Sequence, residues 1–156
     1  MDISIRIATI DDLPMIKTFV DFWLSGRGTK IHAEGAVNDV FISSSQHRTY
    51  IIKYTTFLLF LKTELIGWAV LQYDNQLIHL LISGYFRGLG MGTKLLRYIK
   101  PHRIRSKSDQ SSGDPALFYE SQGYQKIETV SPMHKFNRNK INAGTDKKID
   151  IYEKSF

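Results

Sequence analysis

The sequence predicts an α+β (α/β) domain with a mixed sheet of about six to seven strands, and three observations lead to that class. A strand pattern followed by a helix pattern opens the chain. Three β-rich runs then follow one another over 55–84, separated by short turn sequences, which predicts an antiparallel meander. After the meander a glycine-rich turn leads into a helix, and further helix and strand patterns follow.

The opening segment predicts one strand and one amphipathic helix. Residues 3–8 (ISIRIA) alternate apolar and polar side chains with the period of two that is typical of a strand. The helix predicted over 9–24 begins near the capping candidates Thr9 and Asp11. Its apolar residues at helical spacing are Leu13, Ile16, Phe19, Val20 and Trp23. Residues 25–49 are polar and contain glycine, so we expect a mobile connection there, with one short helix at 35–42.

The meander and the elements after it complete the predicted sheet. Its three strands are separated by the turn sequences KTE (62–64) and DN (74–75). The helix after the glycines is predicted to end before Pro101, with Met91, Leu95, Leu96 and Ile99 on one side. The remaining predicted elements are a strand at 102–108, a short helix from Pro115 to Gly123, strands at 125–130 and 148–154, and a polar loop at about 131–147.

Composition limits both the class of protein and its chemistry. The 156 residues suit a single domain, 1–156, and 42% hydrophobic residues supply a real core, which excludes a disordered or fibrous chain. The chain has no cysteine, so a thiol nucleophile, a disulfide framework and a zinc ribbon are excluded, and no metal site is predicted. Oxygen and nitrogen groups must therefore carry the chemistry.

Charge and hydropathy predict the surroundings in which the protein works. The N-terminal residues lack the basic start and apolar run of a signal peptide, and the most apolar stretch, 57–61, is too short to span a bilayer. We therefore expect a soluble cytoplasmic protein with no membrane partner. A net charge of +6 and a pI near 9.5 favour an anionic partner such as nucleic acid, a nucleotide-like cofactor or an acidic surface. Charge alone does not choose among these partners.

The segment YFRGLGMGTKLL, residues 85–96, places three glycines within five positions at the start of a helix. Such a turn leaves backbone N–H groups pointing outward at the positive end of the helix dipole, which suits an anionic phosphate. The P-loop signature fails, because Thr93 and not lysine follows the last glycine. The dinucleotide fingerprint also fails, because it requires a glycine at Thr93 and a βαβ unit.

Arg87, Gly90 and Gly92 stand at the spacing of motif A of the GNAT superfamily of N-acetyltransferases, and the sequence resembles that family over nearly its whole length. Residues 5–16 (IRIATIDDLPMI) look like the family's opening strand and helix, and ELIGWAVL looks like its third strand. PALFYESQGY is similar to motif B. The resemblance implies the GNAT fold, with helices on both faces of the sheet. It also implies acetyl transfer from acetyl-CoA to a primary amine by direct attack in a ternary complex.

The resemblance assigns donor-binding roles by position. Acyl-CoA would lie where the fourth strand separates from the fifth, with its pantetheine arm on the fourth-strand backbone and its pyrophosphate on the N–H groups of the glycine-rich turn. The fourth-strand residues are Leu80, Leu81 and Ile82, and the turn residues are Arg87, Gly88, Leu89, Gly90, Met91, Gly92 and Thr93.

The same resemblance assigns a general acid, and residue type and position suggest two further site residues. Tyr119 would protonate the departing CoA thiolate as general acid, and the alternative is a tyrosine that only fills the helix face. His79 is the candidate general base because imidazole titrates near neutral pH, and the alternative is a packed or exposed histidine. Asp109 is a candidate acceptor-binding residue, although Ser112 stands where motif B often has asparagine, and a solvated loop is equally consistent.

Other functions remain open at this point. A basic nucleic-acid-binding protein would use the same charge and tyrosines, but the sequence has no zinc-finger spacing, RRM-type aromatic signature or basic heptad region. An acetyltransferase acting on a nucleic-acid-linked amine also fits, as does a degenerate GNAT fold that binds CoA without turnover. The acceptor class is open among small amines, proteins and nucleic acids. A monomer and a homodimer formed through 148–154 are both compatible with the sequence.

Overall fold

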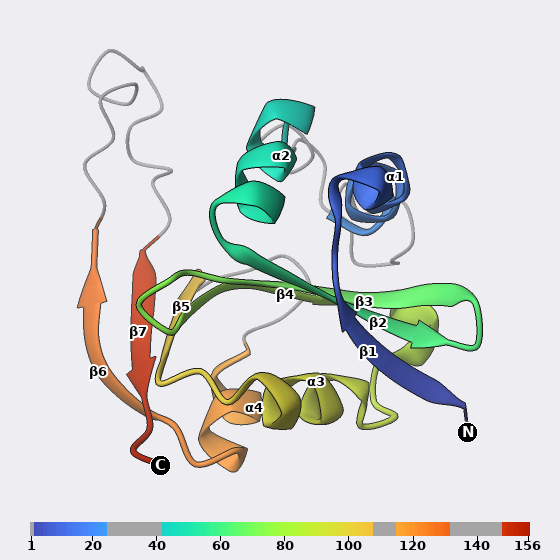
Figure 1. Cartoon of the computed structure of the whole chain (residues 1–156). Coiled ribbons are helices and arrows are strands. Elements are labelled where there is room, and N and C mark those ends of the chain that lie inside the picture. The colour runs from blue at the N-terminus through green and yellow to red at the C-terminus, as the bar shows by residue number, and fades with distance from the viewer. Residues whose placement is uncertain (1, 25–41, 108–114, 132–147) are drawn as a thin grey trace, which may run out of the picture.

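A seven-stranded sheet forms the centre of the protein, in the order β1-β2-β3-β4-β5-β7-β6 (Figure 1). The structure is a computed structural model, and it describes residues 2–24, 42–107, 115–131 and 148–156. Among these residues β4 and β5 form a parallel pair, and the other neighbouring strands pair antiparallel. The predicted mixed α+β class and the antiparallel meander are therefore confirmed.

Each predicted strand has a counterpart in the structure. The strands are β1 Ile3–Ile7, β2 Thr55–Leu61, β3 Glu64–Leu71, β4 Gln76–Ile82, β5 Arg103–Lys107, β6 Gln125–Val130 and β7 Ile149–Glu153. The helices are α1 Leu13–Leu24, α2 Ser44–Ile52, α3 Met91–Ile99 and α4 Ala116–Ser121, and short 3-10 turns are η1 Ile10–Asp12 and η3 Gly84–Phe86. Three of the helices, α1, α3 and α4, match predicted ones.

Helices cover both faces of the sheet, as the resemblance predicted (Figure 1). Helices α1 and α2 lie on one face, where the buried core includes Ile16, Phe19, Val20, Trp23 and Trp68. Helices α3 and α4 lie on the other face, where the buried core includes Met91, Leu95, Leu96, Ile99 and Tyr119. The predicted apolar side of α3 is thus confirmed, and most of the predicted apolar side of α1 is buried as well.

Helix α2 is the element that the sequence did not predict. The mobile connection expected over 25–49 is wrong for 44–49, which is helical. Ser43 caps the helix, because its side chain accepts a hydrogen bond from Gln46 N at 3.0 Å. His47 is the buried residue of α2, so no apolar stripe at helical spacing reveals the helix. The helix predicted at 35–42 lies outside the described residues, apart from Ile42, which is buried and not helical. The loop predicted at about 131–147 also lies outside them, apart from Ser131.

The turn and cap residues behave largely as their types predict. Asn75, in the β3–β4 turn, has a φ of 66°, a conformation that asparagine tolerates, whereas Lys62, in the β2–β3 turn, has a φ of 54°, which lysine rarely adopts. Thr9 is the N-cap residue at the start of η1, which leads directly into α1. The carboxylate that completes this cap belongs to Asp12, which accepts from Thr9 N at 2.8 Å, and not to Asp11.

Gly67 of β3 lies in a place that leaves no room for a side chain. A Cβ at this position would lie 3.0 Å from Ile82 Cδ1 and 3.1 Å from Leu59 Cβ. We expect Gly67→Ala to lower the free energy of unfolding by about 1–3 kcal/mol through overpacking, measured by urea denaturation. Because Ile82→Val removes the Cδ1 methyl, the double variant should recover part of the loss. Equal stability of Gly67→Ala and the wild type would contradict this packing.

Candidate functional site

Strand β4 loses its β5 neighbour partway along its length. The last residue pair between these strands is Leu77 with Ile104, although β4 continues to Ile82 and β5 continues to Lys107. Beyond this pair no described strand lies hydrogen-bonded between them. We call this opening the β4–β5 split.

The backbone groups that face the split belong to alternate residues of β4. Ser83 N donates to Ile66 O of β3 at 2.8 Å, so the backbone groups of Ser83 point toward β3. Because successive residues of an antiparallel ladder point their N–H and C=O groups to opposite sides, those of Leu80 and Ile82 point into the split. The groups of Leu81 point toward β3, and its side chain is buried on the α1/α2 face. Of the three predicted edge residues, Leu80 and Ile82 therefore face the split.

The split ends at a turn that presents backbone N–H groups to solvent. Gly90 is the N-cap of α3 with φ of 82°, and Lys94 N makes the first hydrogen bond of the helix, to Gly90 O at 3.0 Å. The N–H groups of residues 91–93 precede that bond and have no intrahelical acceptor. Gly88 also has a positive φ, 79°, and a Cβ on either glycine would meet no atom within 4 Å. The turn therefore has an open outer surface at the positive end of α3.

Gly92 differs from the other two glycines. A Cβ there would lie 3.2 Å from Cζ of Phe118 in α4. The absence of a side chain at Gly92 therefore lets α3 pack against α4. The sequence pattern alone could not distinguish this role from that of making room for a phosphate.

Arg87 links the turn to the end of β4. Its Nε donates to Ile82 O at 3.2 Å. Burial lowers the pKa of Arg87 from its usual value, but a guanidinium remains protonated in proteins. The turn thus has a fixed positive charge beside its backbone donors. Leu89, with 56% of its surface exposed, extends from the same turn.

Tyr119 lies on the α3/α4 side of the split. Its side chain is only 6% exposed and hydrogen-bonds to the side chain of Ser106 in β5. Ser106 is the second residue after Ile104, where pairing with β4 ends. Burial, and then the neighbouring Tyr152, raises the pKa of Tyr119 well above that of an ordinary phenol, so the hydroxyl is protonated at neutral pH.

His79 lies on the opposite, α1/α2 side. It is the second residue of β4 after Leu77, where pairing with β5 ends. Its ring stacks on Trp68, with centroids 5.0 Å apart and planes 28° apart, and its Nε2 lies 3.0 Å from Tyr50 Oη of α2. The two predicted catalytic residues therefore belong to the parts of β4 and α4 that approach the split from opposite faces. Tyr50 is a residue of this site that the sequence did not predict.

His47 of α2 is buried in the same region. It is 1% exposed, its ring lies 5.6 Å from the ring of Trp68, and neither ring nitrogen has a hydrogen-bond partner among the described residues. Burial, and to a smaller extent the nearby charge of Lys17, lowers the pKa of His47 to about 4, and Asp21 partly opposes this shift. The imidazole is therefore neutral in the folded protein at neutral pH.

This buried imidazole is expected to make folding sensitive to mild acid. Its pKa is lower when folded than when unfolded, so the unfolded chain binds the proton first as the pH falls from about 6.5 toward 4. Stability should be complete above this window and should fall by about 2–3 kcal/mol across it, measured by urea denaturation at each pH. His47→Leu should flatten this dependence, whereas His102→Gln, at an exposed histidine, should keep it. Equal slopes in His47→Leu and the wild type would contradict the assignment.

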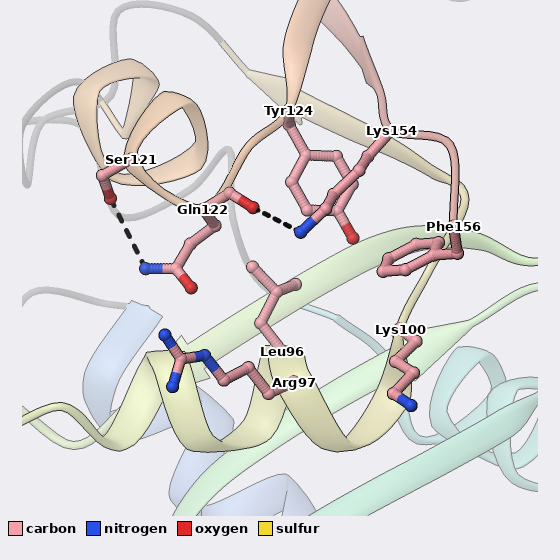
Figure 2. Close-up of a pocket in the computed structure, with 8 residues that line it drawn as sticks. All are labelled: Leu96, Arg97, Lys100, Ser121, Gln122, Tyr124, Lys154 and Phe156. Carbon is pink, nitrogen blue, oxygen red and sulfur yellow. Dashed lines mark hydrogen bonds between the residues drawn. The ribbon is translucent and has the colours of Figure 1, made fainter.

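A separate pocket of about 340 Å³ opens beside the C-terminal half of α3 (Figure 2). Its lining residues are Leu96, Arg97, Lys100, Ser121, Gln122, Tyr124, Lys154 and Phe156. Lys154 Nζ donates to Gln122 O at 2.7 Å and lies 5.0 Å from the ring centre of Phe156. Gln122 Nε2 in turn donates to Thr93 Oγ1 at 3.2 Å, which connects this wall to the first turn of α3. Neither predicted catalytic residue lines the pocket.

Two further observations bear on the predictions. Asp109 lies outside the described residues, so its predicted acceptor-binding role stays a prediction. Within the described ranges, no helix combines the length and the apolar character needed to cross a membrane.

Comparison with known proteins identifies the family to which this chain belongs. Residues 29–137 match the family model described as an acetyltransferase (GNAT) domain, and no curated protein matches the sequence. The fold superposes on Arabidopsis thaliana Naa50 in complex with the bisubstrate analogue CoA-Ac-MVNAL, with a TM-score of 0.67, 15% identity and 100% of both chains covered. It also superposes on PaiA N-acetyltransferase of Thermoplasma acidophilum in complex with coenzyme A, with a TM-score of 0.63, 18% identity and 99% and 100% covered.

A third solved structure is the ribosomal-protein-S18-alanine N-acetyltransferase of Escherichia coli, with a TM-score of 0.66, 13% identity, and 96% of this chain and 91% of that chain covered. At these identities the superpositions establish a shared fold, and the family model establishes membership. The predicted resemblance is confirmed, and the chain belongs to the GNAT family of acetyltransferases.

Proposed function

We propose that this protein transfers an acetyl group from acetyl-CoA to a primary amine while both substrates are bound. The observation that carries this proposal is the succession of two features along the chain: the open backbone edge of β4 is followed, through the turn at 83–90, by the N-terminus of α3, which Gly90 caps. An extended, amide-containing arm with a pyrophosphate at one end is complementary to that surface. The CoA compounds bound to two of the solved relatives support the same donor.

Donor binding would use mostly backbone groups. The pyrophosphate would accept hydrogen bonds from the N–H groups of residues 91–93, at the positive end of α3, with Arg87 adding charge. The pantetheine amides would pair with the groups of Leu80 and Ile82 that face the split. An arm laid along β4 from the turn ends near Leu77, where β5 rejoins β4, so the thioester would lie between Tyr119 and His79.

The chemistry proposed at that point is direct acyl transfer. The neutral amine attacks the thioester carbonyl, a C–N bond forms, and the C–S bond breaks as the tetrahedral intermediate collapses. The amine first loses a proton to a base, for which His79 is the candidate. After the attack the departing thiolate takes the proton of Tyr119, and the Tyr119 oxygen regains a proton from the nitrogen of the collapsing intermediate. Because burial raises the pKa of Tyr119, the phenol keeps its proton at neutral pH and has it available when the thiolate departs.

The acceptor would approach from the α1/α2 face, where His79 lies. Its identity as a small amine, a protein amine or a nucleic-acid-linked amine stays a prediction, and the net charge of +6 is what favours the last of these. A cytoplasmic location and a monomeric or homodimeric state likewise stay predictions.

Thermal unfolding with acetyl-CoA tests the donor. At about 100 times its dissociation constant a ligand stabilises the native state by roughly 2.7 kcal/mol, which should raise the unfolding midpoint by about 5–10 °C in a domain of this size. ATP and NAD at matched concentration should raise it much less. If all three anions raise the unfolding midpoint equally, the glycine-rich turn binds anions in general and is not specific for acetyl-CoA. Transfer itself would be followed by mass spectrometry of alkylamine and peptide acceptors.

A further inference from the structure

Tyr50 and His79 form a hydrogen-bonded pair on the α1/α2 face of the split. Tyr50 Oη lies 3.0 Å from His79 Nε2, and the two rings are 5.2 Å apart at an angle of 58°. Trp68 stacks on His79, so the imidazole contacts two aromatic rings. Its orientation is therefore set by packing as well as by the hydrogen bond.

The protonation state of Tyr50 fits a hydrogen bond that its hydroxyl donates to His79. Burial raises the pKa of Tyr50, so the phenol keeps its proton at neutral pH. Gln46, one turn earlier on α2, also hydrogen-bonds to Tyr50, and this contact partly opposes the effect of burial on the pKa. A protonated phenol at 3.0 Å can donate to His79 Nε2, and in that arrangement neutral His79 carries its own proton on Nδ1.

This arrangement has a chemical consequence for the base. With the phenol as donor, the Nε2 lone pair of His79 is occupied, so an incoming amine would meet the Tyr50 oxygen instead, which can accept a proton. Building on the function proposed above, we infer that Tyr50 receives the proton of the acceptor amine and passes its own proton to His79 Nε2 in the same step.

The proton balance of this relay closes without another reactant. The amine N–H bond breaks and a new O–H bond forms on Tyr50, while the original Tyr50 O–H bond breaks and an N–H bond forms on His79. Tyr50 is neutral before and after, and the positive charge of the ammonium group moves to the imidazole. Trp68 stacks on that ring at 5.0 Å, a geometry that favours a cation over an aromatic face.

Imidazole nitrogen NMR tests the hydrogen bond without any acceptor. The ring signals of His79 would be assigned by their loss in His79→Gln. In the free protein near neutral pH we expect the proton on Nδ1 and a hydrogen-bonded lone pair on Nε2, with the Nε2 signal shifting in Tyr50→Phe and staying in Tyr54→Phe. Tyr54 stacks on Tyr50 at 6.0 Å and so is a matched control. A proton on Nε2 in neutral His79 would overturn the inference.

Kinetics test the relay. With an alkylamine that the wild type acetylates, Tyr50→Phe and His79→Gln should each lower kcat by about 100-fold or more near neutral pH, and the double variant should lose little more. With hydroxylamine, which is already unprotonated at that pH, both variants should stay close to wild type. Equal losses with both amines, or no loss in Tyr50→Phe, would overturn the relay. Acetyl-CoA should raise the unfolding midpoint of both variants as much as that of the wild type. If it does not raise the midpoint of the wild type, the result counts against the proposed function and not against the relay.

Discussion

Tyr119→Phe is expected to lower kcat for acetyl transfer by about 100- to 10,000-fold, the range that a well-placed general acid contributes. The variant removes only the hydroxyl, which hydrogen-bonds to Ser106 on the edge of the split. The KM for acetyl-CoA should change little, because the proposed donor contacts are backbone groups of β4 and α3. A steady-state assay that detects free CoA thiol measures both constants.

Tyr124→Phe is the matched control for that experiment. Tyr124 is also buried, and its hydroxyl donates to Pro101 O at 2.6 Å, away from the split. Its loss should cost about 1 kcal/mol of folding stability, as should the loss of the Tyr119 hydrogen bond, while leaving kcat near the wild-type value. If Tyr119→Phe lowers kcat no more than Tyr124→Phe does, Tyr119 is a packing residue and the proposed acid is wrong.

The sequence predicted those parts of the site in which the backbone conformation requires a particular type of residue. Gly88 and Gly90 adopt positive φ, which glycine favours, and they mark the turn at the start of α3. The alternation and turn signals of the meander likewise place β4 before that turn. Tyr119 was identified by its position in a short motif, because nothing in its type distinguishes it from Tyr124, which the fold uses differently.

The parts that the sequence did not predict depend on contacts between distant residues. Helix α2 has no apolar stripe, because the side chains that it packs toward the sheet are those of His47, which contacts Trp68, and Tyr50, which contacts His79. The contact of Tyr50 with His79 joins positions 29 apart, and no local pattern reports it. Gly92 matches the motif like Gly90, yet its clearance is toward Phe118 and not toward solvent. Local periodicity and turn chemistry cannot distinguish these cases.

The two faces of the sheet have different tasks in this arrangement. The α3/α4 face is held by close packing, with Gly92 against Phe118 and Tyr119 against Ser106, and presents the donor turn. The α1/α2 face gathers titratable and aromatic groups, among them His47, Tyr50 and His79. A single sheet therefore separates the group that would protonate the leaving thiolate from the pair that would deprotonate the amine. The split is the place where the two substrates would meet.

Gly90→Val is expected to weaken acetyl-CoA binding by about 100-fold or more. Its side chain would extend over the open N-terminus of α3, where no protein atom lies within 4 Å of the new Cβ, and would take the space of the pyrophosphate. Two lost hydrogen bonds to a charged group correspond to at least about 3 kcal/mol, or about a 100-fold change in the dissociation constant. Isothermal titration calorimetry with acetyl-CoA measures the change directly.

The control for Gly90→Val must reproduce its backbone strain at a distance from the turn. A β-branched residue at a φ of 82° should cost about 1–3 kcal/mol of folding stability. Asn75→Val places the same side chain at a φ of 66° in the β3–β4 turn, so it should lose similar stability and keep the affinity for acetyl-CoA. Equal affinities in the two variants would mean that strain alone explains the result, and that the backbone groups at the start of α3 do not hold the donor.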